Sequence, residues 1–187
     1  MDFHQQLFDP NSEIADQWSR HEFEQCTFKN LDLSKAVLAN ASFTNCRFDQ
    51  CNLGMAVLEG TKLDDVVFRN CILNSLHFGH CSSFGFRVDF QECQLDYTSF
   101  LNRNLKKTRF VDCSLKEARF MQCDLGGALF KNCNLELTLF AGNTLTQVDF
   151  STSYNLTLDP DGNKLKKTKF SLHSLPGLLT KYDIVLG

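Results

Sequence analysis

The sequence lacks the features that mark secreted and membrane-spanning proteins. It has no run of about 18 apolar residues, which a membrane-spanning helix would need. Its first residues include Asp2 and Asp9 but no basic stretch followed by an apolar one, so they do not resemble a signal peptide. We therefore expect a cytoplasmic protein that does not contact a membrane.

Signals of catalysis and of nucleic-acid binding are also missing. There is no GxSxG, phosphate-binding loop or HExxH motif, and no CxxC pair that would begin a zinc site. The 19 Lys and Arg residues are balanced by 22 Asp and Glu residues, and they form no concentrated basic patch of the kind that binds DNA. We expect no enzyme activity, no cofactor, no metal and no direct nucleic-acid binding.

What the sequence does have is a repeat of five residues. Every fifth residue is Phe or Leu from Phe23 to Phe78 and again from Phe90 to Phe150. A small residue usually stands two positions before each of these, and all nine cysteines lie in this second column. The other three columns are mostly polar. One large and one small residue in every five are therefore candidates for burial.

A period of five fits neither an α-helix nor a flat strand. A chain that turns a corner every five residues explains it, because one large and one small side chain then point inward on each side. Four sides close a coil of about 20 residues, and successive coils pair at about 4.8 Å, the ordinary strand spacing. We expect the stacked core to include Phe28, Phe48, Phe68, Phe90, Phe100, Phe110, Phe120, Phe130, Phe140, Phe150, Cys93, Cys113 and Cys133.

Segments such as CTFKN, CRFDQ and CDLGG resemble the pentapeptide-repeat family. The resemblance implies an all-β fold, a right-handed quadrilateral β-helix, here followed by a short C-terminal helix. We divide the chain into an N-terminal cap (1–22), the repeat β-helix (23–157) and a C-terminal cap or dimerisation module (158–187). The cysteines are then small buried side chains with free thiols rather than disulfides or metal ligands.

Two irregularities interrupt the repeat. The register slips by two residues within 79–89, which is either a tolerated insertion or a contact loop. Arg103 occupies a position that should point inward. Because burying an unpaired guanidinium is costly, we expect Arg103 to swing outward or its corner to be distorted.

The C-terminal segment predicts a short helix capped by Ser174, with Pro176 in its first turn. The apolar residues of this segment are Leu175, Leu178, Leu179, Tyr182 and Ile184, the first four at helical spacing. They form either the cap of a monomer or a self-complementary dimer surface. The ending resembles the C-terminal module of Qnr-type quinolone-resistance proteins, which implies a homodimer through the C-terminus.

The Qnr resemblance also implies a function. Such proteins imitate DNA and engage the type II topoisomerases gyrase and topoisomerase IV, which modulates the action of quinolones or toxins. The candidate phosphate mimics are Glu22, Glu24, Asp64 and Asp65, expected on one side, and Glu59, Asp89, Glu92 and Asp96, expected to cluster near the slip.

Charge is divided unevenly along the chain. Residues 1–100 have 14 acidic and 7 basic side chains, whereas residues 101–187 have 8 acidic and 12 basic ones. A basic half beside the expected dimer centre departs from a DNA mimic. The alternative is a general protein-interaction scaffold that uses a comparatively apolar side. That side carries Leu101, Met121, Leu139 and Ala141.

Overall fold

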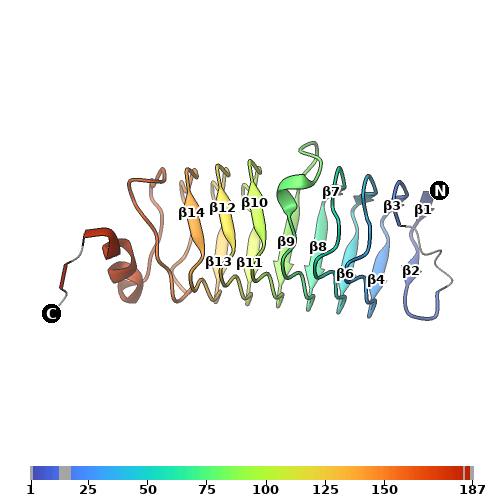
Figure 1. Ribbon diagram of the computed structural model, residues 1–187, viewed down its shortest axis with the longest axis horizontal. Helices are drawn as coiled ribbons and strands as arrows, with labels where there is room; N and C mark the ends of the chain where they lie inside the picture. Colours follow the sequence, from blue (N-terminus) through green and yellow to red (C-terminus); the bar gives the residue numbers. More distant parts are fainter. Residues whose placement is uncertain (1, 13–17, 183, 186–187) are drawn as a thin grey trace.

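The computed structural model describes residues 2–12, 18–182 and 184–185. Figure 1 shows coils stacked along one axis into a rod, with the termini at opposite ends. The strands are β1 (Asp2–His4), β2 (Leu7–Phe8), β3 (Glu22–Glu24), β4 (Thr27–Lys29), β5 (Ser42–Thr44), β6 (Arg47–Asp49), β7 (Lys62–Asp64), β8 (Val66–Arg69), β9 (Val88–Gln91), β10 (Ser99–Leu101), β11 (Arg109–Val111), β12 (Arg119–Met121), β13 (Leu129–Lys131) and β14 (Leu139–Ala141). The 3₁₀ helices are η1 (Phe78–His80), η2 (Leu172–Leu178) and η3 (Thr180–Tyr182).

All strand pairs are parallel, and each residue lies opposite the equivalent residue of the next coil. Phe28 is opposite Phe48, and Phe110 is opposite Phe130. The sheets have the orders β1-β3-β5-β7, β10-β12-β14 and β13-β11-β9-β8-β6-β4-β2. This pairing confirms the predicted β-solenoid with a coil of four short sides.

We number the sides by their order in each coil. The first side contains β1, β3, β5 and β7 and continues through the bridged residues Asn104, Asp124, Thr144 and Lys164. The second side is the seven-stranded sheet. The third side is held by bridges that include Asn52 to Ile72 and Gln94 to Ser114. The fourth side contains the Val37–Val57 bridge and then β10, β12 and β14.

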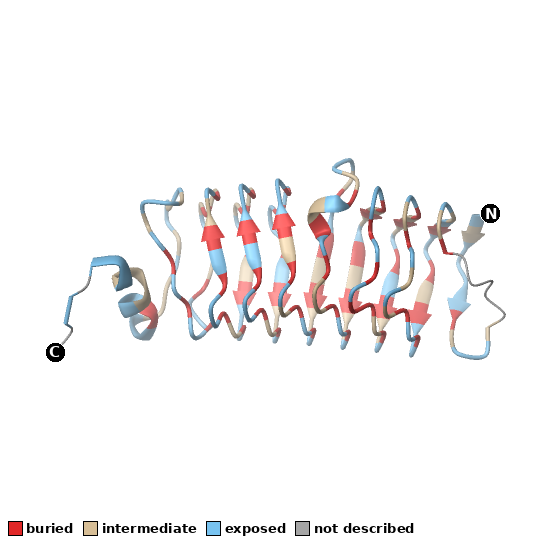
Figure 2. Ribbon diagram, viewed as in Figure 1, coloured by how far each residue is buried: buried red, intermediate tan, exposed pale blue. Residues whose placement is uncertain are grey.

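The predicted core is confirmed, because every Phe and Leu of the repeat is buried. Figure 2 shows the alternation of buried and exposed residues along each strand. Rings stack along the rod, as in Phe100 and Phe120, whose centroids are 4.8 Å apart. They meet edge to face across it, as in Phe110 and Phe120 at 5.7 Å. Both arrangements are favourable for aromatic rings.

The column of small side chains has a second role besides filling space. The Thr138 hydroxyl donates to the carbonyl oxygen of Leu115 at 2.7 Å, and the Cys133 thiol donates to that of Phe110 at 3.3 Å. Each acceptor lies 23 residues earlier, in the preceding coil. All nine cysteines are buried free thiols. This column therefore fastens neighbouring coils together through polar groups.

The two ends of the rod differ from the repeat. Parallel pairing already begins at β1, which lies opposite β3, and Trp18 is buried against Phe8. Positions 1 and 13–17 of the expected N-terminal cap lie outside the described residues. At the C-terminus a short helix is present, but its predicted start is wrong. Ser171 is the cap, because its hydroxyl oxygen accepts the N–H of Ser174, which is buried inside η2.

A left-handed residue forms most corners of the coil. Asn30, Asn45 and Gln50 have φ of 54°, 53° and 55°, and Gly127 has φ of 70°. Asn and Gly tolerate this region, whereas other side chains are strained in it. The corner geometry explains why Asn and Gly recur two residues after the central Phe or Leu.

Leu137 also occupies a corner, with φ of 56° and an exposed fraction of 72%. Leucine is strained in this left-handed region. We expect Leu137→Gly to raise the free energy of unfolding by about 0.5–1 kcal/mol, because relief of strain exceeds the entropy that glycine adds to the unfolded chain. Denaturant unfolding measures the change. Leu139→Gly, two residues away in β14, is the control and should destabilise. An unchanged or lower stability for Leu137→Gly would contradict the strain argument.

Candidate binding surfaces of the rod

The acidic residues predicted to share one side do so. Glu22 and Glu24 belong to β3 and Asp64 to β7 of the same sheet, and Asp65 occupies the next corner with φ of 59°. Glu24 pairs with His4, at 3.4 Å between Oε2 and Nδ1. The N-terminal half of the first side therefore presents carboxylates from β3 and β7, whereas β5 between them has none.

The four acidic residues expected to cluster near the slip are not brought together. Glu59 lies on the fourth side, where its carboxylate is 3.5 Å from His80. Asp89 lies in β9 on the second side, and Glu92 occupies the following corner. Asp96 lies on the third side and accepts the Ser114 hydroxyl at 2.6 Å. Neighbours in sequence point in different directions here, because the chain turns a corner every five residues.

Arg87, which the sequence did not single out, reduces the charge of this surface. Its Nη2 lies 2.8 Å and its Nε 2.9 Å from Oδ1 of Asp64. Lys62 also lies 3.6 Å from the same carboxylate. The two-residue slip places Arg87 beside β7, and its side chain therefore reaches Asp64. Asp64 is therefore largely neutralised, whereas Glu22 and Asp65 have no ion pair within the described residues.

The fourth side carries the exposed apolar residues expected of it, together with the exposed Arg119. Leu101 lies opposite Met121, which lies opposite Ala141, and Leu139 is in the adjacent column. Leu101, Met121 and Leu139 are exposed despite their size. Val37 and Val57 extend the apolar character toward the N-terminus. His77 and the exposed Arg119 interrupt this surface, so its apolar part is the column of Leu101, Met121 and Ala141 with Leu139 beside it, a size and character found in protein contacts.

The register slip is a loop that replaces one strand of the first side. Val66 lies opposite Val88, two residues beyond the regular offset. The chain leaves η1, passes through Phe84, which is 79% exposed, and rejoins the second side at β9. Figure 1 shows this loop projecting from the rod. Lys62 Nζ lies 5.9 Å from the Phe84 ring centroid.

Arg103 corrects our expectation, because it stays inside with an exposed fraction of 8%. Its guanidinium donates to the carbonyl oxygens of Leu101, Cys81 and Gly79 at 3.1, 3.0 and 2.8 Å. Its Cζ also lies 5.5 Å from the Phe86 ring centroid. Burial raises the pKa of Cys81 to about 12, so Cys81 is a neutral neighbour and not a counter-ion. The loop turns carbonyls inward, and these satisfy the donors that we expected to need solvent.

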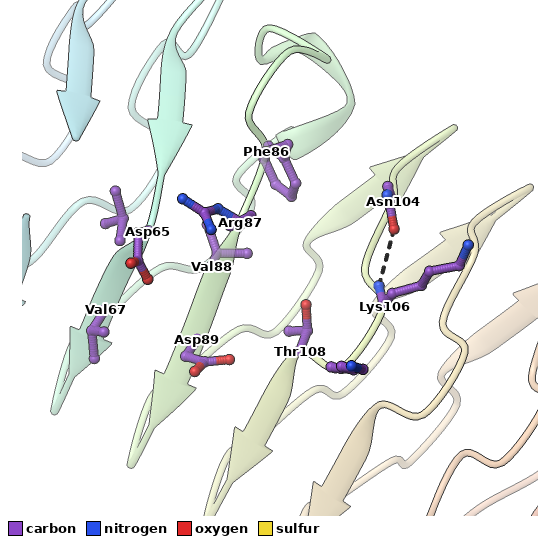
Figure 3. Close-up of a pocket in the computed structure, with 11 residues that line it drawn as sticks. Asp65, Val67, Phe86, Arg87, Val88, Asp89, Asn104, Lys106 and Thr108 are labelled. Carbon is purple, nitrogen blue, oxygen red and sulfur yellow. Dashed lines mark hydrogen bonds between the residues drawn. The ribbon is translucent and has the colours of Figure 1, made fainter. Parts of the chain in front are cut away.

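A hollow of about 280 Å³ lies beside this loop, between the acidic and basic halves of the rod. Figure 3 shows Asp65, Val67 and Asp89 on one wall and Asn104, Lys106 and Thr108 on the other. No three His, Cys, Asp or Glu side chains within the described ranges are arranged to hold a metal ion. None of the described helices has the length and apolar character needed to cross a bilayer.

Comparison with known proteins agrees with this geometry. A family model described as a pentapeptide repeat region matches residues 18–100 and 82–159. The chain belongs to the pentapeptide repeat family. Comparison with curated protein sequences finds no match.

Two solved structures show what this pentapeptide-repeat protein is similar to. A trypsin-treated form of QnrB1, a plasmid-mediated fluoroquinolone resistance protein, is 20% identical with a TM-score of 0.50, and the match covers 100% of this chain and 97% of QnrB1. HetL from the cyanobacterium Nostoc sp. strain PCC 7120, involved in heterocyst differentiation regulation, is 16% identical with a TM-score of 0.43. That match covers 91% of this chain and 83% of HetL. The likeness to QnrB1 establishes the fold.

The C-terminal end of this pentapeptide-repeat protein exposes apolar side chains. Leu175, Tyr182 and Ile184 are exposed, whereas Leu178 and Leu179 are half-buried, and Leu178 packs against the core. Lys181 pairs with both Asp159 and Asp161, which ties η3 to the preceding turn. The hydrogen bond from Lys181 holds the pKa of Asp159 below its ordinary value. The predicted dimer residues therefore sit on a module that is fixed to the end of the rod.

Proposed function

We propose that this protein is a non-catalytic, cytoplasmic binding protein that engages a type II topoisomerase, gyrase or topoisomerase IV, in place of DNA. The observation that carries the proposal is the carboxylate-bearing first side, with Glu22, Glu24 and Asp65 presented by a rigid rod. The fold shared with QnrB1, a fluoroquinolone resistance protein, supports it. Such binding would modulate the action of quinolones or toxins on the enzyme.

The charge density of the rod limits where it imitates DNA. Residues 1–100 have a net charge of −7. They span about five coils, or roughly 24 Å at a spacing of about 4.8 Å. This is one net charge in about 3.4 Å, half the density of duplex DNA, which has one in about 1.7 Å. Residues 101–187 have a net charge of +4. We therefore assign the imitation to the N-terminal half and not to direct binding of nucleic acid.

We also propose that the protein is a homodimer joined through the C-terminal module. Leu175, Tyr182 and Ile184 are exposed at the C-terminal end of a single copy of the chain. A second copy, with the same surface, buries them in a self-complementary contact. This arrangement would place the basic halves at the centre of the assembly and the acidic halves at its two ends.

A second candidate function is a general protein-interaction scaffold without topoisomerase activity. The exposed apolar residues of the fourth side favour it, because they are aligned in successive coils by the strand register. The dispersal of Glu59, Asp89, Glu92 and Asp96 over three sides and a corner favours it as well. The two candidates use different sides of the rod and are separable by mutation.

We expect purified protein to inhibit DNA supercoiling by gyrase or to relieve quinolone-stabilised DNA cleavage. The triple variant Glu22→Lys, Glu24→Lys and Asp65→Lys should need at least about tenfold more protein for the same effect, because a basic groove then meets like charge. The control is Asp32→Lys, Asp112→Lys and Glu117→Lys, which changes the net charge equally but not on the first side. If neither topoisomerase responds to the unmodified protein, the proposal fails and the scaffold remains.

A further inference from the structure

One corner of the rod differs from the others in the residues that form it. Most corners have a residue with positive φ, and the corner between the third and fourth sides contains Met55, Tyr97 and Leu137, with φ of 59°, 62° and 56°. Among the described residues with positive φ, only these three have large apolar or aromatic side chains, and the rest are polar, charged or glycine. We call the three residues the apolar corner.

The apolar corner conflicts with two physical preferences. A left-handed backbone is strained for side chains other than those of glycine and asparagine. Met55, Tyr97 and Leu137 are also 55%, 55% and 72% exposed, which leaves their apolar surface in water. The stability of the rod therefore does not account for these residues. Strain that is held at exposed apolar positions indicates a binding site.

The apolar corner is a regular array along the rod. Each of its residues lies two coils from the next, because Ser75 and Glu117 occupy the same corner in the coils between them. At about 4.8 Å per coil, an apolar side chain recurs about every 9.6 Å, and the three residues span about 19 Å. A partner that contacts all three must have a similar repeat.

This spacing distinguishes the conformations that a protein segment can adopt. A polyproline II helix rises about 3.1 Å per residue with three residues per turn, so residues on one face recur about every 9.3 Å, a mismatch of about 0.6 Å over the array. Two turns of an α-helix measure about 10.8 Å, a mismatch of about 2.4 Å over the array. Residues on one face of an extended strand recur about every 6.8 Å and do not match. The polyproline II helix fits best.

A hollow on the same corner gives such a segment a place to insert. It has a volume of about 370 Å³ and is lined by Tyr97 and Leu137, two successive members of the array. Leu139 lines it from the fourth side. An aromatic ring beside apolar side chains is typical of grooves that bind polyproline II segments. The corner therefore has both the spacing and the lining that such a segment requires.

The hollow also contains two charged groups that the rod leaves unpaired. Glu117 and Arg119 line it, both are exposed, and neither has an ion pair within the described residues. A segment with one basic and one acidic side chain among its prolines complements this pair of charges. We propose that the apolar corner binds a proline-rich segment of a partner protein in the polyproline II conformation, with its charged side chains on Glu117 and Arg119. The proposal gives the scaffold candidate a partner and does not depend on topoisomerase binding.

Fluorescence anisotropy with the full-length protein tests the binding. The probe is a fluorescein-labelled peptide of about twelve residues, with an adjacent arginine and glutamate at its centre and proline elsewhere, and at about 3.1 Å per residue it spans the array. It should bind with a Kd below about 1 mM. A peptide of the same length and charge, with alanine and leucine at helical spacing, should bind at least about tenfold more weakly.

Variants locate the site and separate binding from stability. Tyr97→Asn and Leu137→Asn should each weaken binding of the proline peptide at least about tenfold, because an apolar anchor is lost. Their midpoints of denaturant unfolding should stay or rise, because asparagine tolerates positive φ. Gln122→Asn, at a different corner with φ of 55°, is the control and should change neither quantity. The double variant Glu117→Gln and Arg119→Gln should weaken binding about threefold, as expected for exposed ion pairs.

The outcomes decide this proposal separately from the gyrase experiment. Absence of binding by the proline peptide, or tighter binding of the helical peptide, would overturn it. Equal weakening by Gln122→Asn and Tyr97→Asn would also overturn it, because the peptide would then bind elsewhere. Lower unfolding midpoints in both Tyr97→Asn and Leu137→Asn would remove the argument from strain on which the site rests. Binding at the apolar corner without any effect on gyrase would support the proposal and favour the scaffold candidate.

Discussion

Replacement of Arg103 by methionine is expected to lower the free energy of unfolding by about 2–4 kcal/mol, a severe loss for one residue. Methionine keeps the apolar stem and much of the volume, but it leaves the carbonyl oxygens of Gly79, Cys81 and Leu101 without their donor. Unsatisfied buried acceptors cost about 1–3 kcal/mol each, offset by removal of a buried charge. Denaturant unfolding measures the change.

The loss should be local as well as global. Amide hydrogen exchange of 78–90 should accelerate in Arg103→Met, because the guanidinium ties the loop to the next coil. The exchange rates of Arg103→Lys should lie between those of the parent protein and those of Arg103→Met, since an ammonium keeps the charge but cannot span three carbonyls. Arg119→Met is the control, as Arg119 is exposed on β12 and has no ion pair within the described residues. If Arg103→Met and Arg119→Met lower the free energy of unfolding by equally small amounts, the Arg103 guanidinium does not hold the loop.

The repeat makes most of this fold predictable from sequence. A Phe or Leu at every fifth position leaves only one inward direction on each side, so the core follows directly from the spacing. The stacking of Phe100 on Phe120 follows from the coil length in the same way. Even the slip at 79–89 is evident as a change of register. The five-residue pattern and the overall fold agree, and a fold can be predicted from sequence when the two agree in this way.

The binding surfaces were less predictable, because they depend on the direction in which each side chain points and not only on the spacing of residues along the chain. Glu59, Asp89 and Asp96 are near one another along the rod, yet the corners send them to different sides. Arg103 was expected to swing outward or to distort its corner, because the sequence did not show that the loop turns the carbonyl oxygens of Cys81 and Gly79 inward. The start of the C-terminal helix moved from Ser174 to Ser171 because either serine can cap, and packing selects between them.

Gly177→Ala is expected to detach the C-terminal module from the rod and to convert the proposed dimer to a monomer. A Cβ on Gly177 would lie 1.9 Å from the carbonyl oxygen of Leu156 and 3.0 Å from its carbonyl carbon. Both are backbone atoms, so the helix η2 must move away. The hydrogen bond from the Leu158 N–H to the Gly177 carbonyl oxygen, now 3.1 Å, would then be lost.

The effect on the rest of the rod should be small, because each coil of a solenoid contacts only its neighbours. Multi-angle light scattering on a sizing column measures the mass, and far-UV circular dichroism should change little. Gly162→Ala is the control, since its Cβ would meet nothing nearer than 3.4 Å. A dimer that survives Gly177→Ala would place the interface elsewhere. A monomeric parent protein would leave η2 and η3 as a cap that only closes the last coil, and the acidic halves would then act singly.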